Sequence, residues 1–136
     1  MISQTAEYAL RAILFMAEDS EHAHTTGQIA KETQVPAGYL SKVLQNLSRA
    51  NLVTSQRGLG GGFTLTKDPS ELTVYEIVQA VDPLPRILTC PLKRKDHGKN
   101  LCPLHRKLDD ATALVEKSFR EVTVLELIKK AEHGKK

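Results

Sequence analysis

The chain has 136 residues, no Trp, a formal net charge of +3 and 40% apolar residues. That length fits one domain with a modest core and one appended element, and the lack of Trp argues against a large aromatic-lined ligand cavity. Two cysteines are too few for the disulfide framework of a small secreted protein. Glu7, Arg11 and Glu18 interrupt the partly apolar start, so we expect a core helix there, no membrane contact and a cytoplasmic protein.

The distribution of charge predicts a polyanionic partner. No Asp or Glu occurs between residues 33 and 66. The basic residues of that segment are Lys42, Arg49 and Arg57. Residues 86–107 hold seven Lys or Arg residues against Asp96 alone. Such patches can follow phosphates by releasing counterions, although the run at 93–99 by itself is more typical of a solvated loop.

The first half of the chain predicts three helices. Apolar residues at helical spacing indicate a helix over about 5–18. Thr25 and Gln28 have the spacing of a capping box, which opens a second helix that ends near Gln34. Pro36 suits the first position of a third helix, which is amphipathic and runs to about Ala50. A short helix, a tight turn and a longer amphipathic helix make a helix-turn-helix.

The segment after the third helix predicts a β-hairpin. Residues 52–55 and 63–66 have the composition of two strands, and QRGLGGG lies between them. The glycines allow the tip of such a hairpin, with Arg57, to approach another molecule closely. The glycines alone are typical of a flexible turn and Arg57 alone of a solvated charge. Directly after a helix-turn-helix, however, the hairpin is the wing of a winged helix, and this position favours DNA contact.

The second half predicts further helices around a loop. Thr73 and Glu76 suggest a second capping box before a helix to about 81, which two prolines end. Residues 86–101 have the composition of a loop, and Pro103 begins a long helix to about 121 with apolar residues near heptad spacing. A short final helix follows. The long helix needs an apolar partner, which is either a second copy of the chain, the favoured interpretation, or its own domain.

These elements predict a mainly α fold with a small β-hairpin. The expected organisation is a winged helix-turn-helix domain at 1–82, a Cys/His loop at 83–102, for which the resemblance described below implies a sensor role, and a dimerisation helix with a C-terminal helix at 103–136. The N-terminal face of the third helix should enter the major groove of double-stranded DNA. The wing should contact the backbone, with Arg57 in a narrow minor groove. The candidate DNA-binding residues are Ala37, Gly38, Tyr39, Ser41, Lys42, Ser55, Gln56, Arg57, Gly58, Gly60 and Gly61.

The run YLSKVLQNLSRANLVTSQRGLGGGFTLTKDP, followed by ELTVYEIVQAVD, resembles the IscR/NsrR-type winged-helix regulators, the Rrf-two family. The first helix, EYALRAILFMA, and the Cys-bearing loop before a long helix match as well, so the resemblance covers nearly the whole chain. The resemblance implies a homodimer that binds inverted-repeat promoter sites. We expect the protein to act as a repressor. Many members of the family hold an iron–sulfur cluster whose loss, oxidation or reaction with nitric oxide changes the affinity for DNA.

The resemblance also suggests a ligand set. Cluster-bearing relatives have three loop cysteines at six-residue steps, and one branch adds a histidine three residues after the last. The positions that match are Cys90, Cys102 and His105. Asp96, beside His97, replaces the middle cysteine, so the three-thiolate set is incomplete. In another branch a carboxylate near the start of the partner's first helix completes the set, and Glu7 stands at that position.

The chemistry of these residues can be judged from their spacing. Cys102 and His105 put a thiol at a helix N-cap and an imidazole one turn on, where both can face one point and the helix terminus favours a thiolate. Two Cys, one His and one further ligand from Asp96, His97 or Glu7 suit a [2Fe–2S] cluster or a zinc ion. A Cys90–Cys102 thiol–disulfide switch, or no ligand function, are the alternatives. His22, His24 and His133 are interpreted as exposed polar positions without a role.

Two other classes of function compete with a DNA-binding regulator. A metal-dependent enzyme would use Cys90, Cys102 and His105, but no general base or substrate pocket is evident, so we expect no enzyme. A winged-helix module for protein contacts is the other class. Only DNA binding should weaken steeply as salt rises.

Overall fold

The computed structural model describes residues 2–85 and 102–134. Predictions on Cys90, Asp96 and His97 therefore lie outside the described residues. The elements in chain order are α1 (Gln4–Glu18), α2 (Thr26–Thr33), α3 (Ala37–Arg49), β1 (Val53–Gln56), β2 (Gly62–Leu65), α4 (Val74–Val81), α5 (Pro103–Arg120) and α6 (Val124–Gly134). The mainly α fold with a small hairpin is confirmed.

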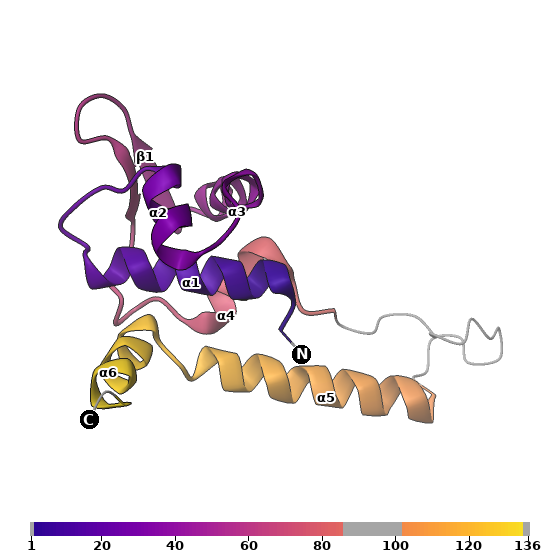
Figure 1. Ribbon diagram of the computed structural model, residues 1–136. Helices are drawn as coiled ribbons and strands as arrows, with labels where there is room; N and C mark the ends of the chain where they lie inside the picture. Colours follow the sequence, from indigo (N-terminus) through magenta and orange to yellow (C-terminus); the bar gives the residue numbers. More distant parts are fainter. Residues whose placement is uncertain (1, 86–101, 135–136) are drawn as a thin grey trace.

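Helix α1 is the central support of the fold. Ser3 caps its N-terminus by accepting a hydrogen bond from the backbone N–H of Ala6. Its apolar residues at helical spacing are buried, and α1 contacts α2, α3, α4, α6 and β2. Figure 1 shows α2, α3 and the hairpin on one side of α1, and α5 with α6 on the other. The two sides of the molecule are therefore held by one shared helix.

The helix-turn-helix follows its prediction closely. The capping box is present, since Thr25 Oγ1 accepts from the N–H of Gln28 and the side chain of Gln28 accepts from the N–H of Thr25. Helix α2 ends at Thr33, and its C-cap residue Gln34 takes a left-handed conformation with φ 59°. Pro36 is the N-cap of α3 and not its first helical residue, with φ −57° and ψ 130°. The difference is one residue, because a proline ring holds φ at a value that suits both positions.

The hairpin is an antiparallel pair whose register matches Val53 with Leu65 and Gln56 with Gly62. Each strand is offset by one residue from the predicted 52–55 and 63–66, so the hairpin includes Gln56 and Gly62. Phe63 pairs in turn with His24, outside the two strands, through hydrogen bonds in both directions. That second pairing joins the wing to the segment between α1 and α2.

Helices α4, α5 and α6 form the second side. Thr73 caps α4 by accepting from the N–H of Glu76, but the Glu76 carboxylate pairs with Lys67 at 2.9 Å. Only half of the predicted capping box is therefore present. Backbone hydrogen bonds on both sides of the Thr73–Thr123 bridge join the start of α4 to the turn before α6.

Helix α5 packs against α4 of its own chain, and Phe119 joins a small apolar cluster there. The alternative of self-packing thus holds for one face of α5. Another face leaves Leu104, Leu108 and Leu114 exposed. None of the helices in the described ranges has the length and hydropathy needed to cross a membrane.

Candidate nucleic-acid interface and metal centre

The N-terminal part of α3 is exposed, as the DNA-contact prediction requires. One face of the helix carries the buried residues Leu40, Val43, Leu44 and Leu47. The predicted contacts lie outside this face and are all exposed: Ala37, Gly38, Tyr39, Ser41 and Lys42. A helix that buries one apolar face and exposes polar residues near its N-terminus has the form of a recognition helix.

Tyr39 is held by neighbours on α1. Its ring meets that of Tyr8 edge to face, with centroids 5.2 Å apart, and its hydroxyl forms a hydrogen bond with that of Thr5. Ser41 Oγ donates to the carbonyl of Ala37 at 3.1 Å. The two hydroxyl groups expected to contact DNA are therefore oriented by the protein before any contact is made. Lys42 adds a positive charge to the same exposed face.

The loop of the wing is built around glycine backbone geometry. Gly58 and Gly60 have φ of 95° and 73°, and the N–H of Gly61 donates to the carbonyl of Gly58 at 2.9 Å. A Cβ on Gly61 would lie 2.5 Å from the carbonyl oxygen of Gln56. Side chains are thus excluded from most of the tip, and its backbone can approach a partner. The other predicted wing contacts, Ser55 and Arg57, are exposed.

The sequence prediction omits Leu59 from the wing. Its relative exposure is 108%, the highest among the large apolar side chains of the described residues. The signal was present in the sequence, because Leu59 is the one non-glycine residue between Gly58 and Gly62.

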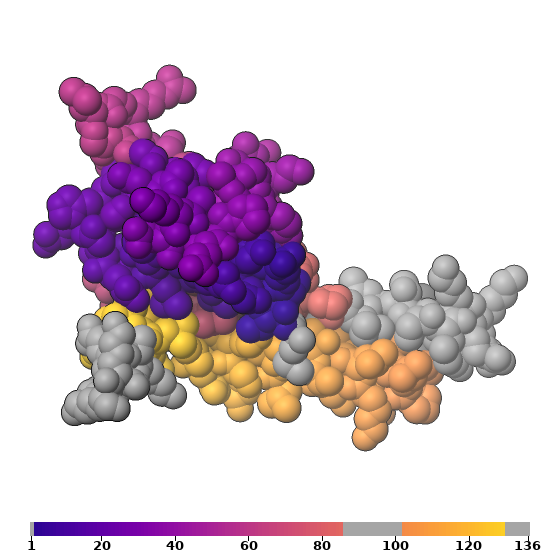
Figure 2. Space-filling view, in the orientation of Figure 1, coloured from indigo at the N-terminus to yellow at the C-terminus, as the bar shows by residue number. Residues whose placement is uncertain are grey.

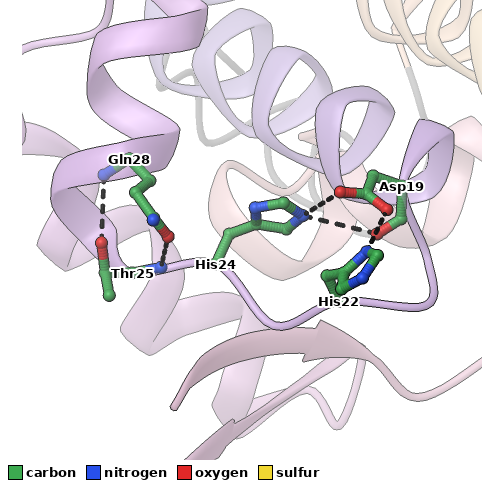
Figure 3. A network of polar contacts seen from close by, with 5 residues as sticks. All are labelled: Asp19, His22, His24, Thr25 and Gln28. Carbon is green, nitrogen blue, oxygen red and sulfur yellow. Dashed lines mark hydrogen bonds and ion pairs between the residues drawn. The ribbon is translucent and has the colours of Figure 1, made fainter. Parts of the chain in front are cut away.

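The base of the wing is fixed to a polar network in the loop after α1 (Figure 3). Asp19 accepts from His22 at 2.7 Å and lies 3.3 Å from Nε2 of His24. The ring of His24 packs on Phe15, with centroids 4.8 Å apart, and its backbone pairs with Phe63. The prediction that His24 is an exposed position is wrong, since the hairpin and α1 cover most of its side chain.

The same network shifts two pKa values. The hydrogen bond from His22 lowers the pKa of Asp19, and the Asp19 carboxylate raises the pKa of His22. Each partner stabilises the charged form of the other.

Cys102 and His105 meet at the start of α5. Cys102 is the N-cap, and its Sγ accepts from the backbone N–H of His105 at 3.5 Å. Both residues are buried, with His105 only 1% exposed. Neither ring nitrogen of His105 has a hydrogen-bond partner among the described residues. A buried imidazole in this state needs a donor, an acceptor or a metal.

The further ligands are not brought to this pair within the described residues. Glu7 is exposed on α1 and forms an ion pair with Arg11 at 2.6 Å. Across residues 2–85 and 102–134, no three His, Cys, Asp or Glu side chains group as a metal site. The buried thiol and the unpartnered imidazole are nevertheless a donor pair of the kind that zinc and iron–sulfur centres use.

Comparison with known proteins identifies the family. The profile of the Rrf2 family, described as iron-dependent transcriptional regulators, matches residues 2–130. The chain belongs to the Rrf2 family. It is therefore a DNA-binding transcriptional regulator and not an enzyme.

Individual relatives agree with this assignment. An rrf2-like HTH-type transcriptional regulator of Rhodobacter capsulatus is 34% identical over 126 residues, which cover 90% of this chain and 81% of the relative. The HTH-type transcriptional regulator IscR of Yersinia pseudotuberculosis is 28% identical, with 93% of this chain and 78% of the relative covered. Among solved structures, T. potens IscR superposes with a TM-score of 0.81 at 22% identity, covering 100% of this chain and 91% of that one. The superposition on T. potens IscR confirms the Rrf2 winged-helix fold.

Proposed function

We propose that this Rrf2 regulator binds inverted-repeat promoter sites as a homodimer and that a metal centre at the start of α5 controls its affinity. In this proposal residues 1–82 read DNA, 83–102 carry the sensor loop and 103–136 form the dimer contact and the C-terminal helix. DNA contact comes from the exposed residues of α3 and the wing given above. The observation that carries this part is their common side of α1, away from α5 (Figure 1).

The DNA interface is tested by the salt dependence of binding. The probe is a duplex of about 30 base pairs selected by the protein from a random pool, long enough for two half-sites one turn apart. Lys42→Ala and Arg57→Ala should each weaken binding and reduce the slope of log K against log salt by about one. Lys129→Ala, at an exposed lysine of α6 on the other side of α1, is the matched control. An unchanged slope in both test variants would contradict the proposed surface.

Dimerisation is proposed for the exposed face of α5. A lone helix with Leu104, Leu108 and Leu114 in water would leave apolar surface uncovered, and a second copy offers the same face. Leu108→Glu should shift sedimentation from dimer to monomer, whereas Leu59→Glu on the wing should not. A wild-type protein that sediments as a monomer at micromolar concentration would refute this part.

The metal centre rests on His105, whose two buried nitrogens have no partner among the described residues. We infer that Cys102 and His105 are two of its ligands, and that Cys90 with Asp96, His97 or Glu7 of a second subunit completes the set. A [2Fe–2S] cluster bound there would supply iron- and redox-dependent chemistry. By holding the metal centre, Cys102 and His105 would fix the start of α5. A fixed α5 would in turn set the spacing of the two recognition helices in the dimer.

The cluster is tested on anaerobically purified protein. A visible absorption spectrum with bound iron and sulfide is expected, and Cys102→Ser and His105→Ala should each lose it. His22→Ala, an exposed imidazole, should retain it. Colourless protein that contains zinc, or a Cys90–Cys102 disulfide seen by mass spectrometry, would replace the cluster with one of these alternatives. Equal DNA affinity with and without the metal would refute control by this centre.

The expected direction of control is repression, because a dimer on an inverted repeat within a promoter excludes polymerase from the same DNA. A promoter–reporter fusion measured with and without the regulator tests the sign. Higher reporter output in its absence supports repression, and lower output refutes it.

A further inference from the structure

The tip of the wing presents one apolar side chain on a narrow support. Leu59 projects from a run in which its neighbours Gly58, Gly60 and Gly61 contribute backbone only. Figure 2 shows the wing standing clear of the rest of the molecule. The other large apolar residues exposed within the described ranges lie on helices or at the N-terminus, where neighbouring side chains cover part of each. Leu59 has no such cover.

The backbone of the tip is shaped for a narrow space. The positive φ of Gly58 and Gly60 and the contact between Gly61 and Gly58 fold the loop tightly. No Cβ fits at Gly61, where it would lie within 3 Å of two carbonyl oxygens. The minor groove of B-DNA is only about 6 Å wide. A loop of mostly glycine backbone that projects few side chains can enter such a groove.

The wing is held to the rest of the domain by backbone hydrogen bonds. Its two strands pair over four residue positions, and the backbone of His24 holds Phe63 by hydrogen bonds of 3.1 and 2.7 Å. Gly62 lies so close to His24 that an added Cβ would be 2.4 Å from its carbonyl carbon. A force on the tip is therefore passed to the body of the domain, as a side chain that separates stacked bases requires.

The charge around Leu59 favours a nucleic acid over an apolar protein groove. Arg57 is two residues away, and no Asp or Glu occurs between residues 33 and 66. We propose that Leu59 enters the minor groove beside the operator half-site and wedges into a base step, partly unstacking it and bending the duplex. Leucine is among the apolar residues that act as such wedges in minor-groove proteins. This inference rests on the proposed DNA contact of the wing.

The preferred base step follows from the mechanics of DNA. Pyrimidine–purine steps unstack most easily, so a wedge binds best where such a step faces the wing. A dimer places two wedges symmetrically about the centre of the operator. The bend should thus depend on Leu59 in both subunits and on the sequence beneath it, with no hydrogen bond to a base.

The test uses the selected duplex with a donor and an acceptor dye at its ends. Leu59→Ala should weaken binding about tenfold, because the variant loses the leucine side chain that DNA would bury in the complex. It should also lower the energy transfer between the two dyes, which reports bending. Its salt slope should stay at the wild-type value, because no charge is removed. Leu59→Met should retain both affinity and bending, since Met is also an apolar wedge. Arg57→Ala should reduce the slope instead.

Each outcome separates the wedge from the wider proposal. Equal affinity and equal bending by wild type and Leu59→Ala would overturn the wedge while leaving the DNA-binding surface intact. If the wild-type protein showed no salt-dependent binding to the duplex, the proposed function itself would be overturned. A melting temperature unchanged in Leu59→Ala confirms that the variant is folded.

Discussion

Replacement of Gly62 by alanine should uncouple the wing from the rest of the domain. Gly62 has φ 139°, and a Cβ there would lie 2.4 Å from both the carbonyl carbon and the oxygen of His24. These are backbone atoms, so no rotation of a side chain relieves the clash. Relief requires the hairpin to move away and to lose the two hydrogen bonds between Phe63 and His24.

The magnitude follows from these contributions. A positive φ costs an alanine about 1–2 kcal/mol, and each lost backbone hydrogen bond costs about 0.5–1.5 kcal/mol. Together with the two hydrogen bonds, these contributions predict a loss of about 2–5 kcal/mol in the free energy of unfolding. In a domain of this size, that corresponds to a fall of roughly 10 °C in Tm. The affinity for the selected duplex should fall as well, because the wing is no longer held.

The assay combines thermal unfolding followed by circular dichroism with DNA titration. Gly27→Ala is the matched control, since its Cβ meets nothing closer than 3.9 Å and α2 benefits from alanine. The control should keep or raise Tm by a few degrees. A Gly62→Ala variant with wild-type Tm and wild-type affinity would refute the conclusion that this contact holds the wing.

Three further expectations concern the supporting structure. Asp19→Asn should return the raised pKa of His22 to about its ordinary 6.5 in an NMR titration, whereas Glu21→Gln should lower this pKa less. Equal changes of the His22 pKa in the two variants would contradict the Asp19–His22 hydrogen bond as the main cause. Because the folded pKa of His22 is raised, its stabilising contribution is complete below the ordinary pKa and disappears as pH rises through the folded value. Leu44→Ala removes a fully buried side chain of α3 and should cost about 2–5 kcal/mol in urea unfolding, with a value under 1 counting against the assigned core. Thr25→Ala should cost about 1 kcal/mol by removing the capping box, and unchanged stability would show that the cap is dispensable.

The helices and the wing were predictable because their signals are local. A capping residue at Thr25, a proline beside α3 and a glycine-rich run between two short strands each act within a few residues of chain. The N-cap at Cys102 followed from the same logic, since Pro103 suits the first helical position. The errors in this group are shifts of one residue at Pro36 and in the strands.

Contacts between distant segments were not predictable from local pattern. His24 is covered because its backbone happens to pair with Phe63, thirty-nine residues later. Glu76 reaches Lys67 instead of closing its capping box, because the turn before α4 places the lysine within 2.9 Å. Leu59 was missed for another reason: its place as the one non-glycine residue of the run was visible in the sequence, but the run was interpreted as a glycine loop only.

The bridge between Thr73 and Thr123 fixes the C-terminal end of α5 to the start of α4. The anchor consists of backbone hydrogen bonds from Val74 to Val122 and from Val124 to Leu72, together with the Arg120 guanidinium 3.7 Å above the ring of Tyr75. Eighteen residues give α5 a length of about 27 Å. A tilt of about 5° at the anchor moves the far end by about 2 Å, the scale of helix shifts in regulated proteins. The far end is the N-terminal end of α5, where Cys102 and His105 lie. A small tilt of the helix would therefore displace these two residues most and the joined C-terminal end least.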